Sequence, residues 1–238
     1  MQLPYREHIE EATGRVTAVL TQAAARPGLL NAVIAGAPGW DLYDLTDHLG
    51  QVHRWVVTAI VDGHGRGSSP RAPREPAALL GWFETGAAQL LAALAAPPET
   101  PAWSFSRQPG HDRVGFWLRR QAQENLVHAW DAETAVGAAS ALDPELAWDG
   151  VVEVADVFVP RMQARAMLTA LPYAVLLRPT DVTGELVVGE VAHEVVAELT
   201  GPAQDLLLHV WKRVPDDDLQ WTGDVAAGRA ALARSLTP

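Results

Sequence analysis

Apolar residues recur at steps of three and four positions through the first part of the chain, which is the spacing of one face of a helix. Glycine- and proline-rich stretches, such as residues 63–70, separate these runs and end them. The pattern predicts helices over residues 8–25, 41–62, 76–96 and 116–136. Helices of roughly 20 residues joined by loops are typical of an antiparallel four-helix bundle.

The pattern changes in the last third of the chain. Asp143-Pro144 opens a fifth predicted helix that runs to residue 166, and shorter apolar runs bounded by turn residues follow it. These runs predict strands over 173–177, 185–188, 194–199 and 219–221, with helices over 203–213 and from a cap at Asp224 to 235. We therefore expect an α+β protein with a helix-bundle domain over 1–140 and a small α/β domain over 141–238 that begins with a long helix.

Composition narrows the possible functions. The chain has 238 residues, a formal net charge of −11 and no cysteine. An acidic chain lacks the basic face that phosphate groups require, so we expect no nucleic acid and no membrane surface among its partners. Without cysteine, any thiol chemistry must take its thiol from a small molecule. No apolar stretch approaches a membrane span and the first residues carry charges, so we expect a cytoplasmic protein.

The predicted helix 116–136 carries a polar stripe where a bundle helix needs apolar residues. Glu124 and His128 are four positions apart and project from one face, with Gln121 and Asp131 on the same side. A carboxylate and an imidazole one turn apart can bind one divalent ion if another helix supplies a third ligand. Asp131 would then hold the second ring nitrogen of His128. The alternative is a weak ion pair on a solvated helix face.

The predicted helix 41–62 supplies a candidate for the third ligand. His48 lies beside Leu45 and Val52, so its side chain points inward or to the edge of the core. His53 is displaced by about 140° around the helix, and we expect it to be a neighbour rather than a ligand of the same ion. The alternative for His48 is a hydrogen-bonded core histidine.

Other charged residues have more ordinary expected roles. Asp41 is expected to cap the second helix, with Asp44 in the capping-box position. Arg119 and Arg120 are expected to form a solvated pair. Arg213, in the last turn of its predicted helix, either complements the helix dipole or grips a carboxylate with its planar guanidinium.

Motifs along nearly the whole chain resemble one known family. They are Pro38-Gly39-Trp40, Asp44-Leu45, His48-Leu49-Gly50, Glu124-x-x-x-His128-x-Trp130-Asp131, Gly201-Pro202-Ala203, Asp205-Leu206-Leu207-Leu208, Trp211-x-Arg213 and Thr222-Gly223-Asp224. With these motifs the sequence resembles the mycothiol-dependent maleylpyruvate isomerase family. The resemblance implies a DinB-like, metal-binding four-helix bundle followed by a small C-terminal α/β domain.

The resemblance also implies which residues are functional. The family's zinc site falls on His48, Glu124 and His128, and its functional arginine falls on Arg213. Lys212 stands where the family's Leu-Trp-Gly-Arg motif has glycine, a departure that bears on the substrate rather than on the metal. Two histidines and one glutamate leave an open position on zinc. The same donors also serve non-haem iron(II), so zinc rests on the resemblance.

The implied chemistry is activation of a small-molecule thiol, mycothiol, as a thiolate, because zinc lowers the pKa of a coordinated thiol. Addition of that thiolate to an electrophilic small molecule makes the protein an S-transferase if the adduct is kept. It makes the protein a maleylpyruvate-type cis–trans isomerase if the thiolate is expelled after rotation. Arg213 would hold a carboxylate, and Gln51 or Gln121 would line the site. Two alternatives stay open: a non-catalytic metal-containing binding protein, and a metal-dependent hydrolase that uses zinc-bound water. The oligomeric state is also open.

Overall fold

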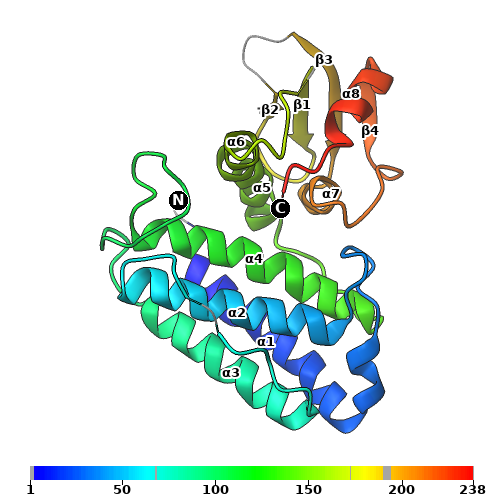
Figure 1. Cartoon of the computed structure of the whole chain (residues 1–238). Helices are drawn as coiled ribbons and strands as arrows, with labels where there is room; N and C mark the ends of the chain where they lie inside the picture. The colour runs from blue at the N-terminus through cyan, green and yellow to red at the C-terminus, as the bar shows by residue number, and fades with distance from the viewer. Residues whose placement is uncertain (1–2, 68, 172, 190–193, 238) are drawn as a thin grey trace. The chain divides into compact units, whose positions relative to one another are not determined.

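The structure is a computed structural model that describes residues 3–67, 69–171, 173–189 and 194–237. It divides into two compact units, Met1–Ser140 and Ala141–Pro238 (Figure 1). The first unit is built from helices and the second combines helices with a small sheet, so the chain has the expected α+β class. Each unit buries its own apolar side chains.

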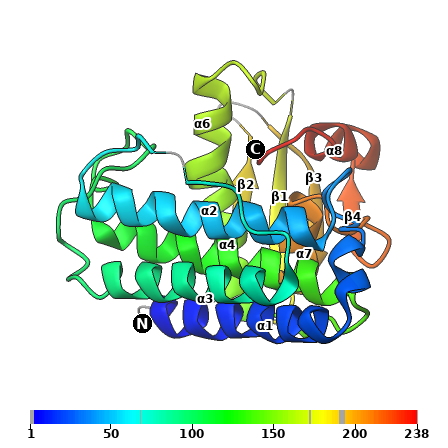
Figure 2. The same ribbon diagram turned by 60° about the horizontal axis from the view of Figure 1, so that its bottom comes forward.

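Four long helices form the first unit. Each of α1 and α2 packs against both α3 and α4, so the helices make a closed ring of contacts, and Figures 1 and 2 show them side by side. This arrangement confirms the predicted bundle. The helices are α1 (Tyr5–Ala25), α2 (Leu42–Val61), α3 (Pro76–Ala93) and α4 (Val114–Ala135), with a short 3-10 helix, η1 (Pro27–Asn31), after α1.

Local signals in the sequence fix where α2 and α3 begin. The Asp41 side chain accepts a hydrogen bond from the backbone N–H of Asp44 at 2.9 Å, and the Asp44 side chain accepts one from the N–H of Asp41 at 3.4 Å. The predicted capping box is therefore confirmed. Glu75 caps α3 by accepting hydrogen bonds from the first turn, and Pro76 occupies a position where a missing N–H costs nothing.

Two helix boundaries differ from the prediction for identifiable reasons. Helix α1 begins at Tyr5 rather than at residue 8, because its first turn is polar and carries no apolar periodicity. Helix α3 ends at Ala93 rather than at 96. The N–H groups of Ala95 and Ala96 bond three residues back, which tightens the chain into a turn before Pro97.

The fifth predicted helix is interrupted. It consists of α5 (Pro144–Glu153), a π-helical segment η2 (Val154–Phe158) and α6 (Val159–Ala164). Pro160 lacks an N–H and its ring clashes with the carbonyl four residues earlier, so a regular α-helix cannot pass through this position. The widened π turn that precedes the proline accommodates it.

The second unit contains a four-stranded sheet with strand order β2-β1-β3-β4. Strand β1 pairs parallel with β3, and the two outer strands pair antiparallel with their neighbours. Helices α7 and α8 contact β1 and β3, and α7 also packs against α5. The elements are β1 (Ala174–Pro179), β2 (Leu186–Val188), β3 (Val195–Gly201), α7 (Ala203–Val210), β4 (Gln220–Gly223) and α8 (Val225–Leu232).

The predicted strands are confirmed with shifts of a few residues, and Asp224 caps α8 as expected by accepting a hydrogen bond from Ala227 N–H at 3.0 Å. Helix α7 ends at Val210, three residues before the predicted end at 213. The chain turns there because Lys212 adopts a left-handed conformation with φ of 61°.

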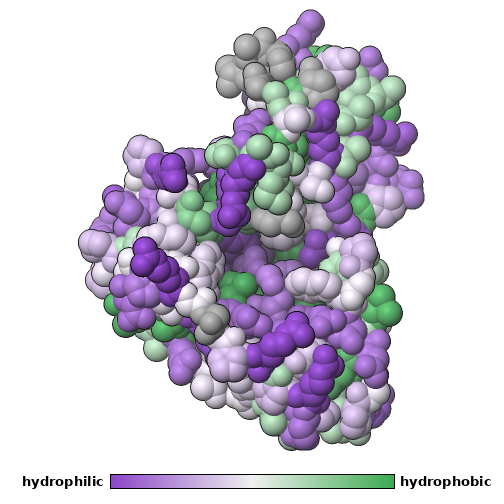
Figure 3. All heavy atoms as spheres, viewed as in Figure 1, coloured by the Kyte–Doolittle hydropathy of each residue, from purple (hydrophilic) through white to green (hydrophobic). Residues whose placement is uncertain are grey.

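Figure 3 shows hydrophilic residues over much of one face, interspersed with small apolar patches. Among the described residues, no helix has the length and apolar character needed to cross a membrane.

Candidate metal centre

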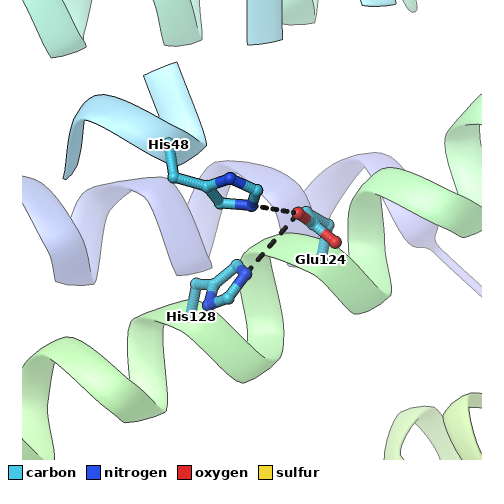
Figure 4. A group of neighbouring side chains, drawn as sticks. All are labelled: His48, Glu124 and His128. Atoms are coloured by element: carbon cyan, nitrogen blue, oxygen red, sulfur yellow. Dashed lines mark hydrogen bonds and ion pairs between the residues drawn. The ribbon is translucent and has the colours of Figure 1, made fainter. Parts of the chain in front are cut away.

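Three side chains from α2 and α4 converge inside the first unit (Figure 4). The Nε2 atom of His48 lies 3.2 Å from Glu124 Oε1, and the Nε2 atom of His128 lies 3.5 Å from the same oxygen. One potential ligand atom from each residue lies within 4.8 Å of the others. The three residues that the sequence singled out as candidate ligands are therefore neighbours in space.

The helices place these side chains by simple geometry. Glu124 and His128 are one turn apart on α4 and face the same side of it. His48 lies on α2, which packs against α4, and its ring stands 5.0 Å from the Trp40 ring. The His48 side chain is 36% exposed whereas that of His128 is 6% exposed, so the cluster is open on the His48 side.

Glu124 is held as a carboxylate. Burial alone would raise its pKa, but hydrogen bonds from His128 and His48, together with the charge of Arg120, hold the pKa well below its ordinary value. Arg120 Nη2 donates to Glu124 Oε2 at 3.0 Å, which leaves Oε1 facing the two histidines. The carboxylate therefore presents one oxygen to the centre of the cluster.

His128 is oriented by Asp131. The Nδ1 atom of His128 lies 3.0 Å from Asp131 Oδ2, so Nε2 is the nitrogen that faces Glu124. Burial alone would lower the pKa of His128, but hydrogen bonds with Asp131 and Glu124 raise it to about 9. A cation that binds at Nε2 of His128 must therefore displace the proton of this ring, and that proton would be released to solvent on metal binding.

The donor set fits a divalent cation. Two imidazole nitrogens and one carboxylate oxygen are the ligands of catalytic zinc sites, and they also occur in non-haem iron(II) sites. A carboxylate that holds the second nitrogen of a ligating histidine is the usual support for such a ligand, and Asp131 stands in that position. His48, Glu124 and His128 are thus the residues that would hold the ion.

The ligand cluster does not include the other predicted site residues Gln51, Gln121 and Arg213. The Nε2 atom of Gln51 donates to Asp47 Oδ1 at 2.8 Å on α2. Gln121 is buried, and its backbone carbonyl accepts a hydrogen bond from Asn125 at 2.8 Å. Arg213 lies in the second unit, where its guanidinium donates to the carbonyl of Trp211 at 2.8 Å. Its functional role stays a prediction.

Lys212, which stands where the resembled motif has glycine, adopts a left-handed conformation with φ of 61°. Glycine adopts positive φ without strain, and a lysine does so at a cost. The Lys212 ammonium donates to the backbone carbonyl of Leu232 at the end of α8. The substituted residue is therefore tied to the neighbouring helix of its own unit.

Arg120 is the main residue that sequence reasoning misjudged. The prediction of a solvated Arg119-Arg120 pair is wrong for Arg120, which is only 3% exposed. It lies four positions before Glu124 on the same helix face, and that spacing was the available signal. A buried arginine needs an anionic partner, and Glu124 is one.

A pocket of about 620 Å³ adjoins the cluster on the His48 side. Its lining comes from one face of α2, from residues just before α2 and from the segment that follows it. Asp47, which is 2% exposed, anchors that segment by accepting a hydrogen bond from the N–H of Ala72 at 2.8 Å. The lining includes Trp40, Asp44, His48, Gln51, Trp55 and Thr58.

His53 is a buried neighbour of the cluster, as expected. It is fully buried, and its Nε2 atom lies 2.8 Å from Asn125 Oδ1. Among the described residues, its Nδ1 atom has no hydrogen-bond partner. Burial lowers the pKa of His53 to about 4, so the folded protein keeps this ring neutral.

This burial predicts a pH-dependent loss of stability. The folded state binds a proton on His53 less readily than the unfolded state does. The neutral ring therefore makes its full contribution to the free energy of unfolding above pH 6.5, and this contribution is lost as the pH falls toward about 4. The pKa difference corresponds to about 3 kcal/mol. Urea unfolding of the metal-free protein at several pH values measures it. The His53→Gln variant should lose less stability than the wild type over that range, and equal losses would contradict the prediction.

The fold and the site together define a class: an α+β protein whose helix bundle brings two histidines and a glutamate together in the arrangement of a metal centre. Residues 7–133 match the family described as "Mycothiol maleylpyruvate isomerase N-terminal domain". The chain belongs to this family, and the three clustered residues lie within the matched region.

Solved structures agree with the fold. A crystal structure of the mycothiol-dependent maleylpyruvate isomerase is similar with a TM-score of 0.64 at 15% identity, over 94% of this chain and 95% of that chain. A histidine-to-alanine mutant of the enzyme is similar with a TM-score of 0.58 at 13% identity, over 91% of this chain and 94% of that chain. At these identities the similarity establishes the shared fold across both units. The search of curated proteins gives no match.

Proposed function

We propose that this protein is a metal-dependent enzyme that uses mycothiol to isomerise a small unsaturated acid of the maleylpyruvate type. The observation that carries the proposal is the cluster of His48, Glu124 and His128 inside the family's own domain. The solved structures with the same fold belong to an enzyme of that activity. The absence of cysteine from the chain is consistent with a reaction whose thiol comes from a small molecule.

The metal that we propose is zinc. When bound, it would lower the pKa of a coordinated thiol so that the thiolate forms at neutral pH. Side chains of α4 would hold and orient the ligands of this metal. Glu124 contributes a negative charge and one oxygen, Arg120 holds the other oxygen, and Asp131 keeps the ring of His128 in the orientation that a ligand needs.

The proposed reaction needs no reactant besides the substrate and the thiol. The thiolate adds to the cis double bond of the substrate, the former double bond rotates as a single bond, and expulsion of the thiolate restores the double bond in the trans geometry. The thiol is regenerated in each cycle. We propose that Arg213 binds a carboxylate of the substrate, because a planar guanidinium pairs with both oxygens of a carboxylate.

A thiol S-transferase is the second candidate. The observation that favours it is Lys212, which stands next to Arg213 where the resembled motif has glycine. A different side chain beside the proposed carboxylate-binding residue favours a different electrophile. If the adduct is released rather than reversed, the same addition step becomes transfer of the thiol. We propose the reducing cytoplasm as the location for either reaction.

The test is a comparison of metal-stripped and zinc-reloaded protein with maleylpyruvate, each with and without mycothiol. We expect the trans product only when metal and thiol are both present. A mycothiol adduct found by mass spectrometry would identify the transferase instead. The same samples are also given an ester and an amide substrate without thiol, and conversion of either would favour the hydrolase. Bound metal without any turnover would leave a binding protein.

A further inference from the structure

The pocket next to the metal centre follows one face of α2. His48 belongs both to the lining of this pocket and to the ligand cluster. A molecule in the pocket would therefore reach the cluster at its open side. The pocket volume of about 620 Å³ lies within the range of small-molecule binding sites.

The charged residues of the pocket balance one another. The lining includes two carboxylates, Asp44 and Asp47, and two guanidinium groups, Arg54 and Arg71. Arg71 pairs with Asp47 at 3.2 Å. Arg54 donates to the carbonyl of Trp82 at 2.7 Å and lies 3.9 Å from the centre of its ring. The pocket has no net formal charge, so it favours an uncharged ligand over a dianion such as the proposed electrophile.

The remaining lining suits a ligand with several hydroxyl groups. Trp40 and Trp55 are large amphipathic side chains that can pack against the carbon faces of a sugar ring. Gln51 uses its Nε2 for Asp47, and among the described residues its Oε1 accepts no hydrogen bond. Thr58 donates to the carbonyl of Arg54 at 3.2 Å and keeps lone pairs that can accept from a ligand hydroxyl.

We propose that this pocket binds the uncharged, hydroxyl-rich sugar portion of the thiol cosubstrate, so that the thiol end reaches the cluster past His48. This inference rests on the proposed function, since it assumes that the thiol is mycothiol. It assigns thiol selectivity to α2 residues that the metal centre does not use. The electrophile then enters from elsewhere, and its binding does not depend on Trp55 or Thr58.

The experiment measures binding of mycothiol and of the uncharged thiol N-acetyl-L-cysteinamide to the zinc-loaded protein by calorimetry. Both thiols carry the same uncharged N-acetylcysteinyl amide, so only the sugar portion differs. We expect mycothiol to bind the wild type at least about tenfold more tightly. Trp55→Leu should weaken the binding of mycothiol about tenfold and Thr58→Val by a smaller factor, while N-acetyl-L-cysteinamide binds as before.

The matched control is Thr85→Val. Thr85 is exposed on α3, and its hydroxyl also donates to the carbonyl four residues earlier, at 2.7 Å, but it does not line the pocket. It should leave both affinities unchanged. Unfolding temperature and zinc content establish that each variant is folded and loaded.

Five results would overturn the proposal, and they differ in what they say of the function. Equal affinities of the wild type for the two thiols, or a pocket variant that leaves mycothiol unaffected or weakens both thiols equally, would overturn the sugar site alone. A changed KM for the electrophile with unchanged mycothiol binding would assign the pocket to the electrophile. Failure of the wild type to bind either thiol would instead remove the proposed function itself.

Discussion

Replacing His48 with alanine is expected to remove almost all bound metal from the protein. His48 is the one ligand that α2 supplies, and its loss leaves Glu124 and His128 as a two-residue pair on α4. Such a pair lacks the three protein ligands that hold a catalytic zinc. Elemental mass spectrometry of untagged protein after dialysis should find about one metal ion per wild-type chain and almost none in the variant.

The control for this prediction is His64→Ala. His64 is exposed in the loop after α2 and is not part of the cluster, so its removal should leave the metal content unchanged. Full metal content in His48→Ala would place the metal elsewhere. A wild-type protein that takes up no metal even after reconstitution would return Glu124 and His128 to the role of an ordinary ion pair.

Replacing Arg120 with methionine is expected to destabilise the protein by about 2–3 kcal/mol, because Glu124 loses a hydrogen bond to a charged group while it keeps its contacts with His48 and His128. Methionine keeps much of the apolar stem, so the change isolates the loss of the guanidinium. Arg120 is buried and Glu124 is largely buried, with side chains that are 3% and 12% exposed. Urea unfolding of metal-free protein, followed by circular dichroism, measures the difference.

Arg15→Met is the matched comparison for that change. Arg15 pairs with Glu133 through two hydrogen bonds of 2.9 and 2.8 Å, but it is more exposed than Arg120, at 14%. Glu133 also keeps its hydrogen bonds from Ser140 when the arginine is lost. We expect a loss of about 1–2 kcal/mol for this variant. A loss for Arg120→Met no larger than that for Arg15→Met would contradict the prediction.

Much of the fold could be predicted because its signals are local. Asp41 and Asp44 form a capping box within one helical turn, and Asp224 caps the last helix in the same way. The pairing of Glu124 with His128 is likewise set by helix geometry alone. The contribution of His48 required a different kind of information, because it depends on α2 packing against α4.

Other features depend on contacts that the sequence does not display. Asn125 is the partner of His53, although the two are 72 positions apart. The sequence alone predicts Arg120 on the surface, because its burial depends on how the helices of the bundle pack. The π segment before Pro160 arises because the chain continues as a helix on both sides of a proline, whereas a sequence pattern predicts only a break. The pocket exists only once the segment after α2 has folded back onto that helix.

The position of the three ligands has a consequence for the mechanics of the bundle. His48 and Glu124 are 76 positions apart, and among the described residues they belong to helices that no disulfide joins, because the chain has no cysteine. An ion held by both helices would act as a removable cross-link that closes this long loop. By analogy with a covalent bridge, the entropy lost from the unfolded chain would stabilise the bundle by on the order of 4 kcal/mol. The bundle would then be rigid where the chemistry takes place and would loosen when the ion leaves.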